Sequence, residues 1–149
     1  MISPKLRVSI VSLELFLAAS TIAGAVVVVP TLPVSWITWG PFADYTIPAL
    51  ALGVLVGGGS LLALAASLRR HPLAGPAAVA AGGMIAIFEV VEMAVIGPVF
   101  MTMPSQPAGW LQLFYFFYGL VLASLGLRLW ITETPRETWT GRLRHTFSV

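Results

Sequence analysis

The chain has 149 residues, of which 58% are hydrophobic and 9% are charged, and its mean hydropathy is +0.92. A soluble domain carries about 25% charged residues, so this composition excludes an ordinary water-soluble protein and indicates that the bilayer is its solvent. There is no cysteine, which excludes disulfides, thiolate nucleophiles and Cys-based metal sites. The net charge of +2 does not come from a basic patch suited to nucleic acid, so no nucleic-acid partner is expected.

Four apolar segments are each long enough to cross a bilayer, because about 20 helical residues cover its ~30 Å hydrocarbon core. Prolines and glycines separate these segments. We therefore predict an all-α, polytopic membrane protein, with a four-helix transmembrane bundle in residues 1–132 and a short basic tail in residues 133–149. The expected spans are residues 8–29, 47–68, 77–97 and 110–131.

The first span follows MISPKLR, which superficially resembles a secretion signal. No small-residue cleavage site precedes a polar start, so we expect a retained helix. Glu14 lies about 9 Å from the inner edge of this span, and Arg128 of the fourth span lies about 5 Å from the same edge, at 1.5 Å per residue. We expect the two to form a buried ion pair that fixes helix register. A catalytic or transport role for Glu14 is the alternative.

The loop before the second span, residues 30–46, is rich in proline and aromatic residues and contains no Lys or Arg. We expect its aromatic side chains to form an interfacial belt with Trp110, with Trp130 and Trp139 at the inner side. Alternatively, the loop is a lid over a pocket for a hydrophobic ligand. Asp44 and Gln106 are expected to form turns rather than to carry chemistry. The aromatic residues of the loop are Trp36, Trp39, Phe42 and Tyr45.

The second span contains GVLVGGGS, in which Gly53 and Gly57 have the GxxxG spacing. Small residues let helix backbones approach closely in lipid. Similar small residues occur in the first span and in the third span, the latter at residues 80–83. These faces pack either within the bundle or against another protein, and the pattern leaves both alternatives open.

The third span carries two carboxylates, Glu89 and Glu92, in the otherwise apolar stretch IAIFEVVEMAVIG. Their i, i+3 spacing places both on one helix face, about 18 and 22 Å from the inner edge. Two adjacent carboxylates do not both stay ionised in a low dielectric, so we expect at least one to be protonated. Ionisable residues inside a membrane mark functional sites by default; a hydrogen-bonded network that only locks the bundle is the alternative.

The fourth span contains LQLFYFFYGL and runs antiparallel to the third. Counting from its inner edge places Tyr118 level with Glu89 and Tyr115 near Glu92, so each glutamate is expected to meet one tyrosine hydroxyl. Two hydroxyl side chains of the first span lie at the same depth. We therefore predict a central polar cluster, either a ligand site or a structural network, in the middle of the bundle. Its expected members are Glu89, Glu92, Tyr115, Tyr118 and Ser20 or Thr21.

All eight basic residues fall on one side of the predicted membrane, and the loops 30–46 and 98–109 contain none. The positive-inside rule assigns that side to the cytoplasm. We therefore predict an inner (plasma) membrane protein with both termini cytoplasmic and the tail on the anionic inner leaflet. The basic residues are Lys5, Arg7, Arg69, Arg70, Arg128, Arg136, Arg142 and Arg144.

The segments PFADYTIP (41–48), FEVVEMAVIG (88–97) and LQLFYFFYGL (111–120) resemble those of small, uncharacterised four-helix membrane proteins common in actinobacteria. Those proteins combine P-F-x-D-[YF]-x-I-P before the second span, an acid or amide shortly before Ile-Gly, and Q-x-x-Y-F-x-x-G at the start of the fourth. The resemblance implies a four-helix fold in an actinobacterial-type inner membrane and no activity. Glu89 is this sequence's own addition, whereas Gln112 joins the expected polar network on this basis. The matching residues are Asp44, Glu92, Gln112 and Tyr115.

Three functional hypotheses follow, and whether the chain is an enzyme stays open. The favoured one is an accessory, assembly or lipid-binding subunit of a larger membrane complex, whose partners are membrane lipids and other membrane subunits or further copies of itself. The second is a small isomerase- or hydrolase-like enzyme that acts on a lipid or isoprenoid, with Glu89 and Glu92 as acid and base. The third is a proton-coupled carrier. No metal-ligand spacing or phosphate loop is present, so no cofactor is expected.

Overall fold

The computed structural model describes residues 4–33, 35, 41–96 and 107–133. Within these ranges the chain forms helices and turns and no β-strand, which confirms the all-α prediction. Four helices are long and apolar enough to cross a membrane. They cover Pro4–Val27, Thr46–Leu68, Ala74–Val95 and Gly109–Glu133.

The first long helix consists of three consecutive parts. Helix α1 (Pro4–Ala23) continues without a break into the π-helical segment η1 (Gly24–Val28), and a 3₁₀ turn, η2 (Val29–Thr31), ends it. A π-helix is rare in proteins and is often found at functional sites. The irregular end of this helix contributes to the cavity described below.

The second long helix also contains a π-helical part. It is built from α2 (Thr46–Leu50), the π-helical η4 (Ala51–Gly57) and α3 (Gly58–Leu68). The remaining two helices, α4 (Ala74–Ile96) and α6 (Pro107–Glu133), are uninterrupted. The chain thus contains two irregular and two regular long helices.

Three helices begin three or four residues earlier than the sequence analysis predicts, and the early turn of each contains a proline. Pro4 and Pro107 are the first residues of α1 and α6, and Pro76 lies in the first turn of α4. Proline is tolerated there because the first N–H groups of a helix have no partner within it. The predicted third span begins at residue 77 and so leaves Pro76 outside it, whereas the structure places Pro76 inside the helix.

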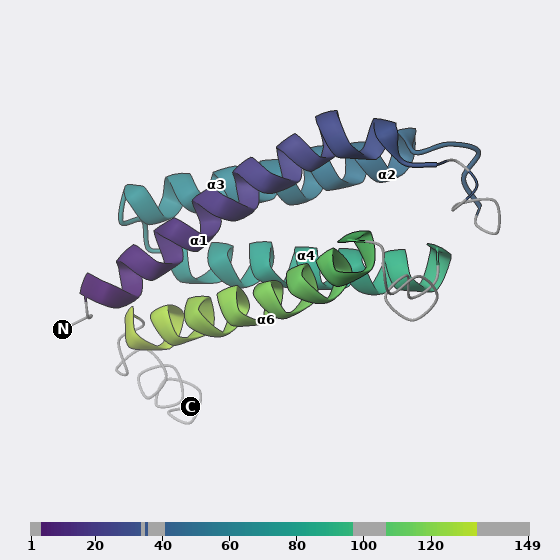
Figure 1. The fold of residues 1–149 in the computed structure, drawn as a ribbon. Coiled ribbons are helices and arrows are strands. Elements are labelled where there is room, and N and C mark those ends of the chain that lie inside the picture. The colour runs from purple at the N-terminus through teal and green to yellow at the C-terminus, as the bar shows by residue number, and fades with distance from the viewer. Residues whose placement is uncertain (1–3, 34, 36–40, 97–106, 134–149) are drawn as a thin grey trace, which may run out of the picture.

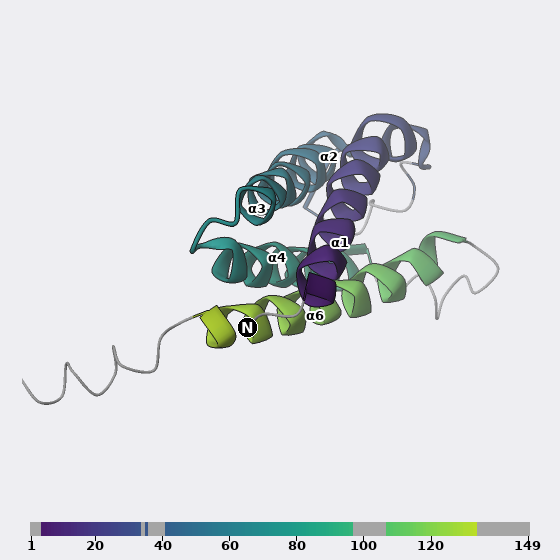
Figure 2. The same cartoon turned by 90° about the vertical axis from the view of Figure 1, so that its left-hand side faces the viewer.

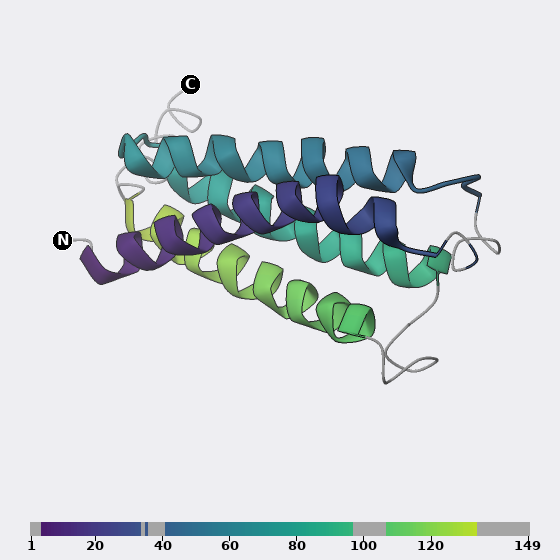
Figure 3. The same cartoon turned by 45° about the horizontal axis from the view of Figure 1, so that its top comes forward.

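The bundle consists of two helix pairs (Figure 1): α1 lies along the α2–η4–α3 helix, and α4 lies along α6. The start of α1 and the end of α6 lie at the same end of the bundle, called here the terminal end. Figures 2 and 3 show that α1 passes close to α6 near this end and diverges from it toward the other. The expectations for Trp36, Trp39, Gln106 and the tail from residue 134 onward fall outside the described residues.

Glycines allow α4 and α6 to pack with their backbones in contact. A β-carbon added at Gly82 would lie 2.5 Å from both the Gly119 carbonyl oxygen and the Ala123 nitrogen. Gly75 and Gly126 leave equally little room, since a β-carbon at either would lie 2.7 Å from a backbone nitrogen of the facing helix. Close approach of this kind strengthens van der Waals packing in lipid. It also fixes the offset between the two helices.

The GxxxG glycines of the second span face the first helix. A β-carbon at Gly57 would lie 2.7 Å from Ile22 Cγ1, and one at Gly53 would lie 3.0 Å from the Ala25 β-carbon. These two glycines therefore pack within the bundle, which is one of the two alternatives that the sequence left open. The adjacent Gly58 differs, because a β-carbon there would meet nothing within 4 Å.

We expect Gly82→Ala to destabilise the bundle, because the new methyl group collides with backbone atoms of α6 that cannot rotate aside. Overpacking of this kind costs about 1–3 kcal/mol in the free energy of unfolding. The measurement is SDS or thermal unfolding of the purified protein in detergent, followed by circular dichroism.

Gly83→Ala is the matched control, since a β-carbon at this neighbouring glycine meets nothing within 4 Å. Alanine also favours helix over glycine by about 1 kcal/mol, so this variant should be as stable as the original protein or slightly more so. Equal losses in the two variants would contradict the packing described for α4 and α6.

Candidate functional site

A cavity of about 360 Å³ lies between α1, η1, η4, α4 and α6, where α1 diverges from α6. Its walls are mainly apolar. It is called here the main cavity. The structure brings six of the seven side chains of the predicted polar network to its lining. These six are Ser20, Thr21, Glu89, Glu92, Gln112 and Tyr115.

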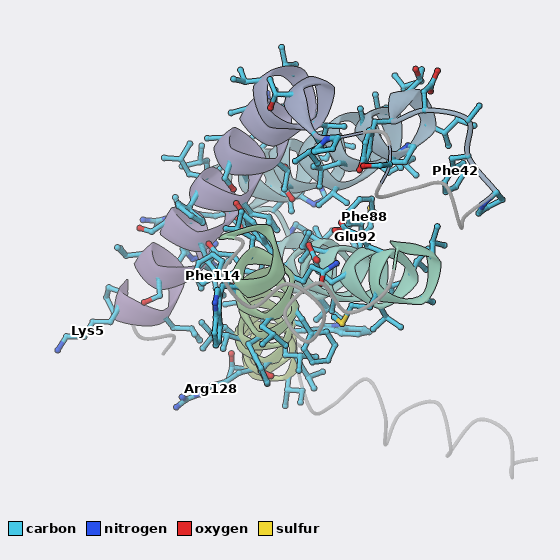
Figure 4. All side chains as sticks on the ribbon, turned by 45° about the vertical axis from the view of Figure 1, so that its right-hand side comes forward. Lys5, Phe42, Phe88, Glu92, Phe114 and Arg128 are labelled. Carbon is cyan, nitrogen blue, oxygen red and sulfur yellow. The ribbon has the colours of Figure 1, made fainter. Side chains whose placement is uncertain are left out.

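Two carboxyl groups face the main cavity from α4, because the i, i+3 spacing sets them on one side of the helix. Glu89 is 4% exposed, and Glu92 is half-buried. The buried Gln112 side chain donates a 3.1 Å hydrogen bond from Nε2 to Glu92 Oε1. Within the described residues no other hydrogen bond reaches either carboxyl group. Figure 4 shows Phe88 and Glu92 beside each other, in the space between α4 and the α2–η4–α3 helix.

The expected pairing of each glutamate with a tyrosine hydroxyl is wrong. The Tyr118 hydroxyl donates instead to the backbone oxygen of Leu13 in α1, at 2.6 Å. At Glu92 the donor is Gln112 rather than Tyr115. The reason is helix offset, because the close glycine contacts between α4 and α6 shift the facing residues by one helical turn from the count made along the sequence.

Tyr118 belongs to an aromatic cluster that joins α1 to α6. Its ring centroid lies 5.4 Å from that of Phe16 and 5.6 Å from that of Phe114, and Tyr115 contacts the same group. Because Phe16 precedes Ser20 by about one turn, the cluster lies next to the main cavity on the side of the terminal end. The cluster therefore holds α1 and α6 together at the point from which they diverge.

The two hydroxyl side chains of α1 line the main cavity but bond within their own helix. Ser20 Oγ and Thr21 Oγ1 both donate to the Leu17 carbonyl oxygen, at 3.3 and 2.7 Å. Hydroxyl groups in membrane helices commonly satisfy themselves in this way. They contribute polar surface to the cavity without a direct bond to the glutamates.

A smaller cavity, of about 150 Å³, adjoins the main one, and the two share part of their lining, including Phe88 and Glu92. The loop before α2 contributes Phe42 and Tyr45 to the smaller cavity. The Tyr45 hydroxyl donates to the Pro33 carbonyl oxygen at 3.2 Å, which closes the described part of this loop on itself. The described residues of this loop thus contribute to the lining of the smaller cavity.

Asp44 forms a turn, as predicted. Its Oδ1 accepts a 2.8 Å hydrogen bond from the backbone N–H of Thr46 at the start of α2. This bond holds the pKa of the exposed Asp44 carboxyl group below its ordinary value. The residue therefore starts a helix and takes no part in the cavity.

The predicted ion pair of Glu14 with Arg128 is wrong. The fully buried Glu14 accepts a 3.1 Å hydrogen bond from Ser67 Oγ of α3, and its second oxygen has no partner in the described part of the chain. Arg128 is exposed and points away from the bundle, as does Lys5 (Figure 4). An Arg side chain near a membrane surface gains more from water than from a buried partner. Helix spacing alone gave no information on which face Arg128 occupies.

The ion pair at the terminal end joins other residues, which the sequence analysis missed. Arg7 of α1 pairs with Glu133 at the end of α6 and also donates to the Ser67 carbonyl oxygen at 3.4 Å. The position of both charges at helix ends was the signal that could have identified them. This pair ties the start of α1 to the ends of α3 and α6.

The main cavity therefore offers carboxyl, amide and hydroxyl groups in an apolar surrounding. Sites of this composition are typical of small-molecule pockets, and neighbouring carboxyl groups can take part in proton transfer. No group of three or more His, Asp or Glu side chains that could hold a metal occurs in residues 4–33, 35, 41–96 and 107–133.

Comparison of the chain with protein-family models, with curated proteins and with solved structures finds no match. The resemblance to small actinobacterial membrane proteins therefore stays a prediction. What the site can do is argued below from the residues of this chain.

We expect Ser67→Ala to destabilise the protein, because the buried Glu14 carboxyl group loses its hydrogen-bond donor. Leaving a buried polar group unsatisfied costs about 1–3 kcal/mol. Ser124→Ala is the control, since that exposed hydroxyl only donates to the Leu120 carbonyl oxygen of its own helix, and it should change unfolding by less than about 0.5 kcal/mol.

A double variant, Glu14→Leu with Ser67→Ala, separates the bond from the shape of the site. Replacing both partners by apolar groups is nearly neutral in many proteins, so it should recover most of the stability lost by Ser67→Ala alone. A double variant less stable than Ser67→Ala would show that Glu14 has a further partner.

Proposed function

We propose that this chain is a lipid-binding membrane protein that acts as an accessory subunit of a larger membrane assembly. Its ligand is an amphipathic molecule whose polar end lies in the main cavity beside Glu89 and Glu92. The apolar part of the ligand lies against the cavity walls and the surrounding lipid. The resemblance to four-helix actinobacterial proteins supports a bacterial inner membrane as the location of this ligand.

The observation that carries the proposal is the grouping of the polar residues around the main cavity. Membrane helices bury their polar groups at sites of ligand or proton handling, and a volume of about 360 Å³ lies within the usual range for small-molecule pockets. The two π-helical segments, η1 and η4, both contribute residues to its lining. Irregular backbone at a cavity is typical of functional regions.

Two glycines on the helix surface support an assembly role. A β-carbon at Gly58 or at Gly83 meets nothing within 4 Å, so these positions leave room for a helix of another subunit to approach closely. The same property fits a second copy of the chain.

The orientation that we propose has the terminal end in the cytoplasm. The described basic residues lie at or beside helix ends at that end of the bundle, in agreement with the positive-inside rule. No Lys or Arg occurs in loop 30–46 or in loop 98–109. The cavity then lies nearer to the outer surface of an inner (plasma) membrane.

An enzyme that acts on a lipid is the second candidate, and one observation favours it. Glu89 and Glu92 stand one helical turn apart at the same cavity, and only Glu92 has a hydrogen-bond donor in the described part of the chain. Two carboxyl groups in different environments can divide the roles of acid and base. The test below separates this candidate from simple binding.

We expect a lipid to remain bound when the protein is extracted gently from its own host membrane, at about one molecule per chain by native mass spectrometry. Gly24→Leu should reduce this occupancy about tenfold, because Gly24 lines the main cavity and a β-carbon there lies in ordinary contact, 3.5 Å from Leu52 Cδ2. The added side chain then fills space that the ligand needs.

Ser124→Leu is the matched control, because it adds the same side chain at an exposed position of α6 outside the lining of the main cavity, and it should keep the lipid. Equal lipid occupancy in all three proteins would contradict the binding site. If Glu92→Gln carries a different molecule from the original protein, the original converts its ligand and is an enzyme. The same molecule in both supports binding without turnover.

The orientation is tested with single cysteines, because the chain has none of its own. Ala43→Cys and Leu73→Cys place a thiol at two exposed positions, one at each end of the bundle. A maleimide that does not cross membranes should label Ala43→Cys in intact cells and Leu73→Cys only after lysis. The reverse pattern would place the terminal end outside.

A further inference from the structure

Resting on the proposed lipid-binding function, we infer the chemical class of the ligand. The polar end of the ligand is an uncharged or cationic hydrogen-bond donor, a hydroxyl or an amine, and the main cavity rejects lipids with an anionic end such as a fatty acid or a phospholipid.

The polar part of the main cavity consists of the Glu89 and Glu92 carboxyl groups, the Gln112 amide and three hydroxyl groups, and it carries no positive charge among the described residues. The single hydrogen bond to the two carboxyl groups within the described residues comes from Gln112 and reaches Glu92 Oε1. Glu89 accepts none there, and its carboxyl group lines the open volume of the main cavity. A ligand that donates a hydrogen bond can therefore bond to this carboxylate, and a ligand that only accepts cannot.

Positive charge is absent from this part of the molecule. Among the described residues that line the main cavity and the smaller one there is no Lys, Arg or His. Along the chain, the two loops that follow η2 and α4 contain no basic residue either. The described basic side chains belong to the terminal end, where Arg7 already pairs with Glu133. An anionic group beside Glu89 and Glu92 would thus meet two carboxyl groups, ionised or protonated, and no positive charge to balance its own.

The energetic difference is large because the surroundings are apolar. Like charges about 4 Å apart repel by about 4 kcal/mol at an effective dielectric constant of 20. An amine reverses the sign of this interaction, and a hydroxyl group avoids it while it still donates a hydrogen bond. The site therefore discriminates between polar ends by charge first and by hydrogen bonding second.

The cavity walls show how such a ligand reaches the site. Val27 of η1 and Leu111 of α6 line the main cavity and are also exposed on the surface of the bundle. On the other side, Ile47 and Val91 line the smaller cavity and are exposed as well. Both cavities thus open sideways toward lipid. A single apolar chain can extend from Glu92 through either opening without leaving an apolar surrounding.

The test uses four probes that share a dodecyl chain and differ only in the polar end: dodecylamine, dodecan-1-ol, dodecanoate and dodecyl phosphate. Each is added to the delipidated full-length protein in a mild detergent, and occupancy is measured by native mass spectrometry over a range of concentrations. We expect the amine and the alcohol to bind at least about tenfold more tightly than the two anions. This ranking is measured on the unmodified protein and needs no variant.

The double variant Glu89→Gln with Glu92→Gln tests the cause, because it keeps the size of both side chains and removes their charge. It should bind the amine about tenfold more weakly while it still binds the alcohol. An unchanged amine affinity would assign the selectivity to other residues and overturn the inference.

The outcomes also distinguish the inference from the function on which it rests. If none of the four probes binds more tightly to the original protein than to Gly24→Leu, the lipid-binding function itself is overturned. If dodecanoate or dodecyl phosphate binds as tightly as the amine, and Gly24→Leu abolishes that binding, the lipid site stands and the inferred ligand class is wrong.

Discussion

The close contact between α4 and α6 is the constraint on which the rest of the structure depends. The glycines on both helices, among them Gly82 and Gly119, let the backbones meet where any side chain would separate them. Helix association in lipid depends on such packing, because lipid tails are as apolar as the helices themselves. The contact also determines which residues face each other, and so it places Gln112 of α6 beside Glu92 of α4.

Helix α1 lies close to α6 near the terminal end and diverges from it toward the other end, and the main cavity results from this divergence. Near the terminal end, Arg7 pairs with Glu133, and the aromatic cluster around Tyr118 holds α1 to α6. Beyond that cluster α1 packs along the α2–η4–α3 helix. Gly57 of η4 lets these two helices approach closely. The space left between α1, α4 and α6 is the main cavity. Tight packing elsewhere is therefore the reason that the opening lies at the two glutamates.

The polar groups inside the bundle form two layers with different roles. In the first layer Glu14 meets Ser67 between α1 and α3, and both side chains are buried. In the second, Glu89 and Glu92 face open volume. A buried carboxyl group with one donor fixes how two helices meet, whereas one that faces a cavity is available to a ligand. The same residue type thus serves packing in one layer and the proposed binding in the other.

The sequence by itself determined the all-α class, the presence of four helices long and apolar enough to cross a membrane, and the placement of Glu89 and Glu92 on one face of a helix. The helix class and the spans follow from hydropathy over about 20 residues, and the shared face of Glu89 and Glu92 follows from helical spacing. It also determined that Asp44 forms a turn, because that bond spans two residues. Only the tertiary structure decided the partners of Glu14, Glu92 and Tyr118. Those partners depend on how the helices are rotated and offset relative to one another. Backbone contacts at the glycines determine this offset to within one helical turn. Counting residues from assumed span ends does not reach that accuracy.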